Sequence, residues 1–285
     1  MWPLPQPRHG ARDSYTTCIS RTKEMGEEKR RTRLTEATDA VEEAGQQFRQ
    51  AAGTKTLHTL KSENFQVPGI EKKEKVTTWL YDYGMLDGPG RDIYDELISA
   101  PKHGRCPLCG HGTVRTLDHF LPKAHFPALC VDPLNLVPAC SDCNKAKSDD
   151  HAVTAEKTPF HPYLDDIDGE KWLAAKVIHE DDSVRLHFRV SPPPSWDHVL
   201  TARAHHHFRV FGLRTMYAQQ ANRHLGEIRG HLQGLLAAGG EETVRAHLRD
   251  GAASSLSDRP NGWHGVTYRT LAGDETFCRG AFGSG

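Results

Sequence analysis

The sequence predicts a mixed α+β fold, in which a metal-clasped central segment carries helices on both sides and a small β-hairpin follows it. Three observations lead to this prediction. Two Cys-x-x-Cys pairs, Cys106 with Cys109 and Cys140 with Cys143, enclose a loop-rich segment. Apolar and charged residues alternate over 184–190, which is the period of a half-buried strand. Apolar residues then recur at helical spacing over 196–236.

The composition sets the class of protein before any motif is considered. The 285 residues include 36 Lys and Arg against 37 Asp and Glu, so the net charge of -1 gives no overall field that would attract a polyanion. A membrane helix needs roughly 18 to 20 apolar residues in a row, and the chain has no such run. Its first residues also lack the apolar core of a signal peptide. We therefore expect a cytoplasmic protein with no membrane partner.

The N-terminal half is expected to be helical. Segment 21–50 is dense in alternating charges and poor in large apolar residues, which predicts a solvated helix. Two short apolar-periodic segments, 77–86 and 91–98, are separated by a Gly-Pro-Gly turn and predict helices beside the centre. We divide the chain into a charged, largely helical or partly disordered segment 1–75, a core with its preceding helices over 76–165, and a C-terminal region over 166–285.

The C-terminal region is expected to begin with a hairpin, because segment 171–179 can pair with the alternating segment 184–190. Three prolines then end the strand, and Ser195 is the predicted N-cap of the next helix. A longer apolar stripe should end at Gly239 and Gly240, with a third helix over 243–248. Short connections make these helices antiparallel neighbours. Their modest basic excess is typical of a solvated face.

The two cysteine pairs predict a structural zinc site. Each Cys-x-x-Cys turn presents two thiolates on one side, and two turns complete the tetrahedral set that Zn²⁺ prefers. Four thiolates leave no open position for a substrate. The binding free energy, on the order of 10 kcal/mol in small zinc modules, would therefore stabilise the fold. A chance pairing or a redox Cys-x-x-Cys is the alternative, and two matched pairs argue against both.

The segment between the pairs carries a second pattern. Asp118 and His119 are adjacent after a strand-like Thr-Val-Arg-Thr-Leu run, Asn135 lies in Pro-Leu-Asn-Leu-Val-Pro, and Asn144 directly follows the last cysteine. Over about 45 residues this pattern resembles the HNH, or ββα-metal, endonuclease family, in the variant with Asn at the last position. Taken singly, each of these residues has a structural explanation, such as turn chemistry for Asn135 or helix capping for Asn144.

The resemblance implies a role for each matching residue. His119 would be the general base that activates water, since a histidine pKa near 6.5 leaves it largely neutral at pH 7. Asp118 and Asn144 would hold a catalytic Mg²⁺ or Mn²⁺, because sparse oxygen ligands suit a cation that keeps most of its waters. Asn135 would hold the loop that positions the histidine. Candidate nucleic-acid contacts are Lys123, Lys145 and Lys147.

The function that the resemblance implies is metal-dependent hydrolysis of DNA phosphodiester bonds, with a 5′ phosphate and a 3′ hydroxyl as products. The phrasing of the motif is similar to that of bacterial HNH nucleases of restriction and antiphage defence, some of which act beside an ATPase subunit. The neutral net charge predicts weak autonomous DNA affinity, so a partner could deliver the substrate. Two alternatives stay open: a nuclease toxin that cleaves RNA or tRNA, and a non-catalytic, zinc-organised nucleic-acid-binding module.

Other chemically active residues give weaker signals. The three consecutive histidines from His205 to His207 fan about 100° apart on a helix and cannot converge on one ion. His207 falls on the apolar stripe and is a candidate core residue. Three cysteines have no partner by spacing and are expected to be free thiols: Cys18, Cys130 and Cys278.

Overall fold

The computed structural model is mixed α+β and mostly helical, with two small antiparallel hairpins, which confirms the predicted fold class at that level. It describes residues 2–23, 29–70, 75–149, 151–181 and 183–283. The chain forms two compact units, Met1–Asp166 and Ile167–Gly285. The predicted segments 1–75 and 76–165 thus lie in one unit. Within the described residues, no helix is both long enough and apolar enough to cross a bilayer.

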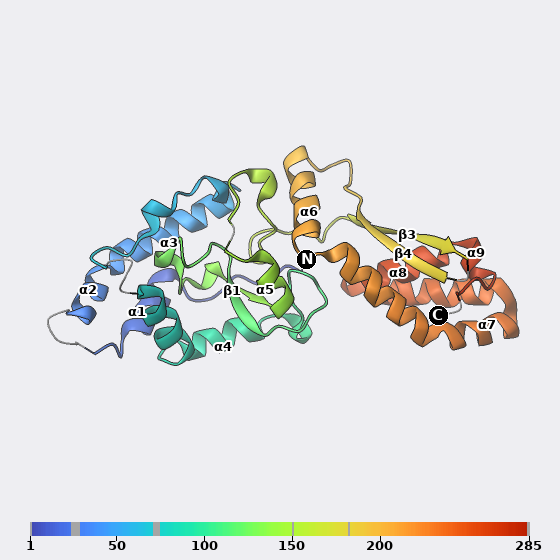
Figure 1. Ribbon diagram of the computed structural model, residues 1–285, viewed down its shortest axis with the longest axis horizontal. Helices are drawn as coiled ribbons and strands as arrows, with labels where there is room; N and C mark the ends of the chain where they lie inside the picture. Colours follow the sequence, from blue (N-terminus) through green and yellow to red (C-terminus); the bar gives the residue numbers. More distant parts are fainter. Residues whose placement is uncertain (1, 24–28, 71–74, 150, 182, 284–285) are drawn as a thin grey trace. The chain divides into compact units, whose positions relative to one another are not determined.

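Unit one surrounds a short hairpin with helices (Figure 1). Strands β1 and β2 pair antiparallel, with Asp118 opposite Val137 and His119 opposite Leu136. Helix α5 follows β2 directly, so the order around the cysteine pairs is strand, strand, helix. The elements are α1 (Ala11–Ile19), α2 (Arg30–Glu36), α3 (Thr38–Gly53), the π-helix η5 (Thr78–Leu86), α4 (Arg91–Ser99), β1 (Thr116–His119), β2 (Leu136–Ala139) and α5 (Ser141–Lys147).

The charged N-terminal segment contributes to the core of unit one, which corrects the prediction of a solvated helix over 21–50. Leu34, Val41 and Phe48 are at most 1% exposed. They recur every seven residues across α2 and α3 and so form a narrow apolar stripe that the surrounding charges hide in the sequence. Ser14 of α1 donates to the carbonyl of Val131 at 2.6 Å, which ties this helical layer to the loop before β2.

Unit two is a hairpin packed on helices. Its elements are β3 (Leu173–Glu180), β4 (Ser183–Val190), α6 (His198–Val210), α7 (Leu213–Asp258), α8 (Trp263–Ala272) and α9 (Glu275–Cys278). The predicted hairpin is confirmed, with Leu173 opposite Val190. The N-cap of α6 is Asp197 rather than the predicted Ser195, because the Asp197 carboxylate accepts from the backbone N–H of Leu200 at 2.7 Å.

Helix α7 reverses direction where the sequence predicts a helix end. Gly240 has a φ of 70° and ψ of -168°, which is not helical and which a side chain would strain. The rings of His231 and His247 lie 4.8 Å apart, whereas sixteen residues of straight helix would separate them by about 24 Å. The two arms of α7 are therefore antiparallel, and Leu232 and Val244 are buried between elements of this unit.

Candidate metal centre and catalytic pocket

The four cysteines predicted as zinc ligands come together in unit one. Their sulfurs all lie within 4.8 Å of one another, and the four residues are buried: Cys106, Cys109, Cys140 and Cys143. A tetrahedron with Zn–S bonds of about 2.3 Å has S–S edges of about 3.8 Å. The Sγ atoms of Cys109 and Cys140 are 3.9 Å apart, close to this edge. The cluster therefore fits a structural Zn²⁺ ion.

The backbone around the first pair is shaped for thiolates. The N–H of Gly112 donates to the Sγ of Cys109 at 3.3 Å, and its carbonyl accepts from the N–H of Cys106 at 2.7 Å. A Cβ at Gly112 would lie 2.8 Å from the Sγ of Cys140, so only glycine fits there. Donation from the neighbouring cysteines, and then from Gly112, holds the pKa of Cys109 far below its usual value. The pKa of Cys140 is also lowered, whereas those of Cys106 and Cys143 are raised by their cysteine neighbours. A metal ion would require all four thiols to be deprotonated.

A separate pocket of about 350 Å³ lies along β1. Three of the four predicted catalytic residues line it: Asp118, His119 and Asn144. The first two end β1, whereas Asn144 is the fourth residue of α5. Asn135, the fourth predicted residue, is not in the lining but lies behind it at 0% exposure. The other residues that line the pocket are Tyr81, Thr116, Leu117, Pro122, Lys123, Ser148 and Asp149.

The imidazole of His119 is fixed by one backbone hydrogen bond. Its Nε2 lies 2.8 Å from the carbonyl oxygen of Cys130. Because a carbonyl only accepts, we assign the proton to Nε2, which leaves Nδ1 as the unprotonated nitrogen. Burial lowers the pKa of His119 to about 3, with the positive charges of Lys123 and Lys147 adding to the shift. The ring is therefore neutral at neutral pH.

The carboxylate of Asp118 is buried at 7% exposure and only partly satisfied. Its Oδ2 has no hydrogen-bond partner among the described residues, and the nearest cation is the ammonium of Lys147 at 3.5 Å. Burial raises the pKa of Asp118 to about 6, and Lys147 opposes that rise. A buried carboxylate oxygen with spare lone pairs beside an open pocket is what a divalent cation would require of a protein ligand.

Lys147 differs from its predicted role as a phosphate contact. Its side chain is buried, and its Nζ donates to the carbonyl of His119 at 2.6 Å. The same ammonium faces Asp118, so the lysine connects the last turn of α5 to the end of β1. Lys145 of the same helix is exposed, as a phosphate contact would have to be.

Asn135 makes three side-chain hydrogen bonds to the loop after β1. Its Oδ1 accepts from the N–H of Leu121 at 2.7 Å, and its Nδ2 donates to the carbonyls of Leu121 at 3.0 Å and Leu129 at 3.1 Å. The N–H of Phe120 donates to the Asn135 carbonyl at 2.8 Å. These bonds hold Leu129, the residue before Cys130, whose carbonyl orients His119.

Two residues of the pocket were missed in the sequence. Tyr81 comes from the π-helix η5; its ring meets that of His119 at 4.7 Å between centroids, and its hydroxyl donates to the Leu117 carbonyl at 3.2 Å. Burial raises the pKa of Tyr81, so its hydroxyl stays protonated. Asp149 supplies a second carboxylate. The run Ser-Asp-Asp after α5 was the available signal for it, whereas nothing local marks Tyr81.

Lys123, the third predicted nucleic-acid contact, lies at the rim of the pocket. Its Nζ is 4.5 Å from the centroid of the Tyr81 ring and 3.7 Å from Oδ1 of Asp82. The side chain is about one third exposed, so its charge remains accessible from the pocket. Lys123 thus packs on Tyr81 and brings a positive charge to a pocket that also contains the carboxyl groups of Asp118 and Asp149.

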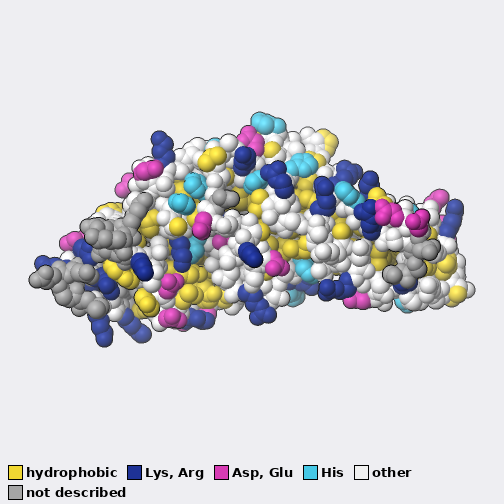
Figure 2. Space-filling view, viewed as in Figure 1, with side chains coloured by type: hydrophobic (Ala, Val, Ile, Leu, Met, Phe, Trp, Pro, Cys, Tyr) yellow, Lys and Arg dark blue, Asp and Glu magenta, His cyan; other side chains and the backbone are white. Residues whose placement is uncertain are grey.

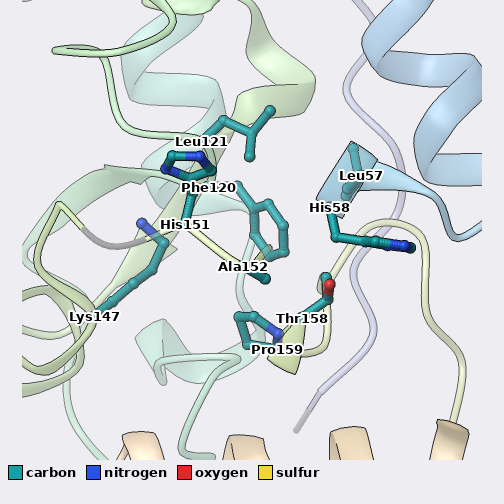
Figure 3. A pocket seen from close by; sticks show the side chains of 9 residues that line it. All are labelled: Leu57, His58, Phe120, Leu121, Lys147, His151, Ala152, Thr158 and Pro159. Atoms are coloured by element: carbon teal, nitrogen blue, oxygen red, sulfur yellow. The ribbon is translucent and has the colours of Figure 1, made fainter. Parts of the chain in front are cut away.

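A second pocket in unit one is too small to compete as a substrate site (Figure 3). Its volume is about 20 Å³, which is room for about one water molecule. Apolar side chains form most of its wall, including Leu57, Phe120 and Pro159, and two histidines, His58 and His151, complete it with Lys147. Of these two pockets, the one beside Asp118 and His119 is large enough for a substrate.

The exposure of the remaining histidines and cysteines tests the weaker predictions made for them. In α6, His205 is exposed, His206 is intermediate and His207 is fully buried, packed against Phe211 at 4.7 Å. The prediction that His207 belongs to the core is thus confirmed. The three cysteines outside the cluster, Cys18, Cys130 and Cys278, are buried and form no disulfide, as expected, and burial raises the pKa of Cys18 to about 12.

The fold and this centre define a class: an α+β protein with a buried four-cysteine cluster beside a pocket that holds an Asp-His pair. The chain is 33% identical over 219 residues to Protein ea31 of Escherichia phage lambda, a match that covers 70% of this chain and 73% of that protein. The chain therefore belongs to the family of Protein ea31. No protein-family model matches it, and no solved structure does either.

Proposed function

We propose that the chain is a metal-dependent endonuclease of the HNH, or ββα-metal, type that hydrolyses phosphodiester bonds in DNA. The observation that carries this proposal is the meeting of Asp118, His119 and Asn144 in one pocket of about 350 Å³. A hairpin followed by a helix presents all three, and the four-cysteine cluster connects the same elements. We propose that this cluster holds a structural Zn²⁺ ion.

In the proposed reaction His119 is the general base. Its Nε2–H is committed to the carbonyl of Cys130, so Nδ1 receives the proton of the attacking water. The low pKa of the buried ring keeps this nitrogen unprotonated before the reaction. Tyr81, packed edge-on against the ring, and Asn135, which holds the loop that carries Cys130, restrict the rotation of the imidazole.

Asp118 and Asn144 would hold the catalytic Mg²⁺ or Mn²⁺. The donor set fits such an ion, because a buried carboxylate oxygen without a hydrogen bond and a neutral amide oxygen line the same pocket. A divalent cation would supply charge stabilisation for the phosphate and the departing 3′ oxygen. Asp149 adds a second carboxylate to the pocket, and Lys123 places a positive charge at its rim.

The test is digestion of supercoiled plasmid by the full chain, with and without Mg²⁺ or Mn²⁺. We expect cation-dependent cleavage with 5′ phosphate and 3′ hydroxyl ends, and loss of at least a hundredfold in rate in His119→Ala, consistent with the contribution of about 10² to 10⁴ from a general base. The matched control is His125→Ala, an exposed histidine outside the pocket lining, which should cleave as the wild type does.

Parallel digestions of single-stranded DNA and total RNA separate the alternatives. Faster cleavage of RNA than of DNA, still dependent on His119, would replace the DNA assignment by a ribonuclease. Binding of nucleic acid that no divalent cation converts into cleavage would identify a zinc-organised binding module. Full activity of His119→Ala would remove the proposed mechanism.

A further inference from the structure

We propose that the outer face of the β3–β4 hairpin in unit two, together with the start of α7, is a binding surface for the phosphate backbone of DNA. This basic face consists of Lys176, Arg185, His187, Arg189 and Arg214. The inference rests on the proposed function for its substrate class, and it concerns a different unit of the chain from the catalytic pocket.

The strand register places these side chains on one face. Lys176 of β3 is opposite His187 of β4, and the neighbouring partners on this face are Ala174 with Arg189 and Ile178 with Arg185. Side chains of a strand alternate between faces, so the residues between them point to the other side. There Leu186, Phe188 and Val190 are at most 5% exposed. The hairpin therefore has one apolar face and one basic face.

The hairpin is held firmly enough to present its charges in a fixed pattern. The ring of Phe188 packs against Tyr217 of α7 at 5.6 Å between centroids. Asn261, in the turn before α8, accepts from the backbone N–H groups of Trp172 and Leu173 at 2.8 and 3.2 Å. Arg269 of α8 donates to the carbonyl of Leu173 at 3.1 Å. The start of β3 is thus tied to the helices beneath it.

The charges of the basic face are largely uncompensated. Lys176, Arg189 and Arg214 are exposed, and the part of the chain that the structure describes offers none of them an ion pair. Arg185 pairs with Glu180 at the hairpin end, with its Nε donating at 3.0 Å. Figure 2 shows Lys, Arg and His side chains over and beside the hairpin, with acidic side chains near its end.

His187 reports the local field at the centre of this face. Partial burial lowers its pKa, and four cations lower it further: Arg214, Lys176, Arg185 and Arg189. After desolvation, these cations are the strongest influences on the imidazole. A chain with a net charge of -1 has therefore concentrated positive charge at one place. The cations on this face repel one another, so a polyanion that neutralises them would stabilise the bound state.

The geometry favours nucleic acid over a membrane surface. Alternate side chains of a strand are about 7 Å apart, and a two-stranded ribbon is narrow enough to enter the major groove or follow a phosphate backbone. Membrane docking requires apolar side chains beside the charges. The large hydrophobic residues found exposed among the described residues are Tyr83 and Val153, and both lie in unit one.

The test is DNA binding by the full chain carrying His119→Ala, so that the duplex is not cut. Fluorescence anisotropy of a labelled duplex is measured between about 50 and 200 mM salt for a variant with Lys176→Gln, Arg189→Gln and Arg214→Gln. The plot of log K against log salt has a negative slope, and each lost phosphate contact makes it shallower by about 0.9. We therefore expect the magnitude of the slope to fall by about 3. Affinity at the lower salt should fall about tenfold or more.

The matched control removes the same charge elsewhere in unit two, with Arg223→Gln, Arg249→Gln and Arg279→Gln, all exposed. Its affinity and slope should stay near the wild-type values. The inference is overturned if both triple variants bind equally well, if they lose affinity equally, or if the first loses only its binding to phosphatidylserine vesicles. The two proposals can fail separately. If the wild-type protein does not cleave DNA but the first triple variant still loses DNA binding, the nuclease proposal fails and the binding surface is supported.

Discussion

Replacing Asn135 by alanine removes all three side-chain hydrogen bonds that close the loop between β1 and β2. Two of them bond the N–H and the carbonyl of Leu121. Among the described residues, the Asn135 side chain is the hydrogen-bond partner of both groups. In the third bond the Asn135 Nδ2 donates to the carbonyl of Leu129. That carbonyl also accepts from the N–H of Asp132 at 3.2 Å, so it keeps a partner. The substitution therefore orphans two buried backbone groups and weakens the bonding of a third.

The magnitude follows from that count. A buried polar group that loses its partner costs about 1 to 3 kcal/mol, and a hydrogen bond whose acceptor keeps another donor contributes about 1 kcal/mol. We therefore expect Asn135→Ala to lower the free energy of unfolding by about 3 to 7 kcal/mol. The Cys130 carbonyl lies in the same loop, so DNA cleavage should also fall while the chain remains folded.

The assay is urea denaturation followed by circular dichroism, with plasmid nicking measured below the unfolding transition. The control is Asn64→Ala, the same change at an exposed position, which should alter the free energy of unfolding by less than about 0.5 kcal/mol. An Asn135→Ala chain with wild-type stability and wild-type cleavage would refute the argument that this side chain holds the loop and orients His119.

Three further predictions follow. Cys106→Ser should release zinc, measured by atomic absorption of the purified chain, and should unfold the segment around the cluster. Lys147→Met leaves the buried carboxylate of Asp118 without its cation and should cost about 3 kcal/mol in urea denaturation, whereas Lys145→Met at an exposed position should cost little. The pKa of His119 is about 3 folded against about 6.5 unfolded, so the unfolded chain binds the extra proton between these values and stability falls as the pH is lowered. From pH 7 to pH 5 this loss should reach about 2 kcal/mol and should be absent from His119→Gln; equal pH dependence of both proteins would contradict the assignment.

Local spacing predicts the parts of this structure that short-range geometry decides. Two Cys-x-x-Cys turns can present four thiolates only in a few ways, and the sulfurs do converge. The alternation over 184–190 likewise has one low-energy arrangement once its apolar face is buried, and the hairpin forms as expected. In both cases the pattern that carries the prediction is local: a Cys-x-x-Cys turn, or the alternation along one strand.

Contacts between distant segments could not be predicted in this way. Tyr81 reaches His119 from a helix 38 residues earlier in the chain, and no periodicity relates the two. A lysine such as Lys147 is expected at the protein surface from its charge. Only the fold shows that its ammonium turns inward to Asp118. The buried stripe of Leu34, Val41 and Phe48 was readable as a seven-residue repeat, but dense flanking charge concealed it.

The reversal of α7 at Gly240 offers a practical opening for protein engineering. The tip is a single left-handed glycine between two long arms, and a Cβ placed there would have no neighbour within 4 Å. Exposed tips of this kind tolerate added sequence better than strands or packed helix faces do. A small fluorescent reporter inserted at that bend would leave the hairpin intact and could follow ligand encounters of unit two in real time.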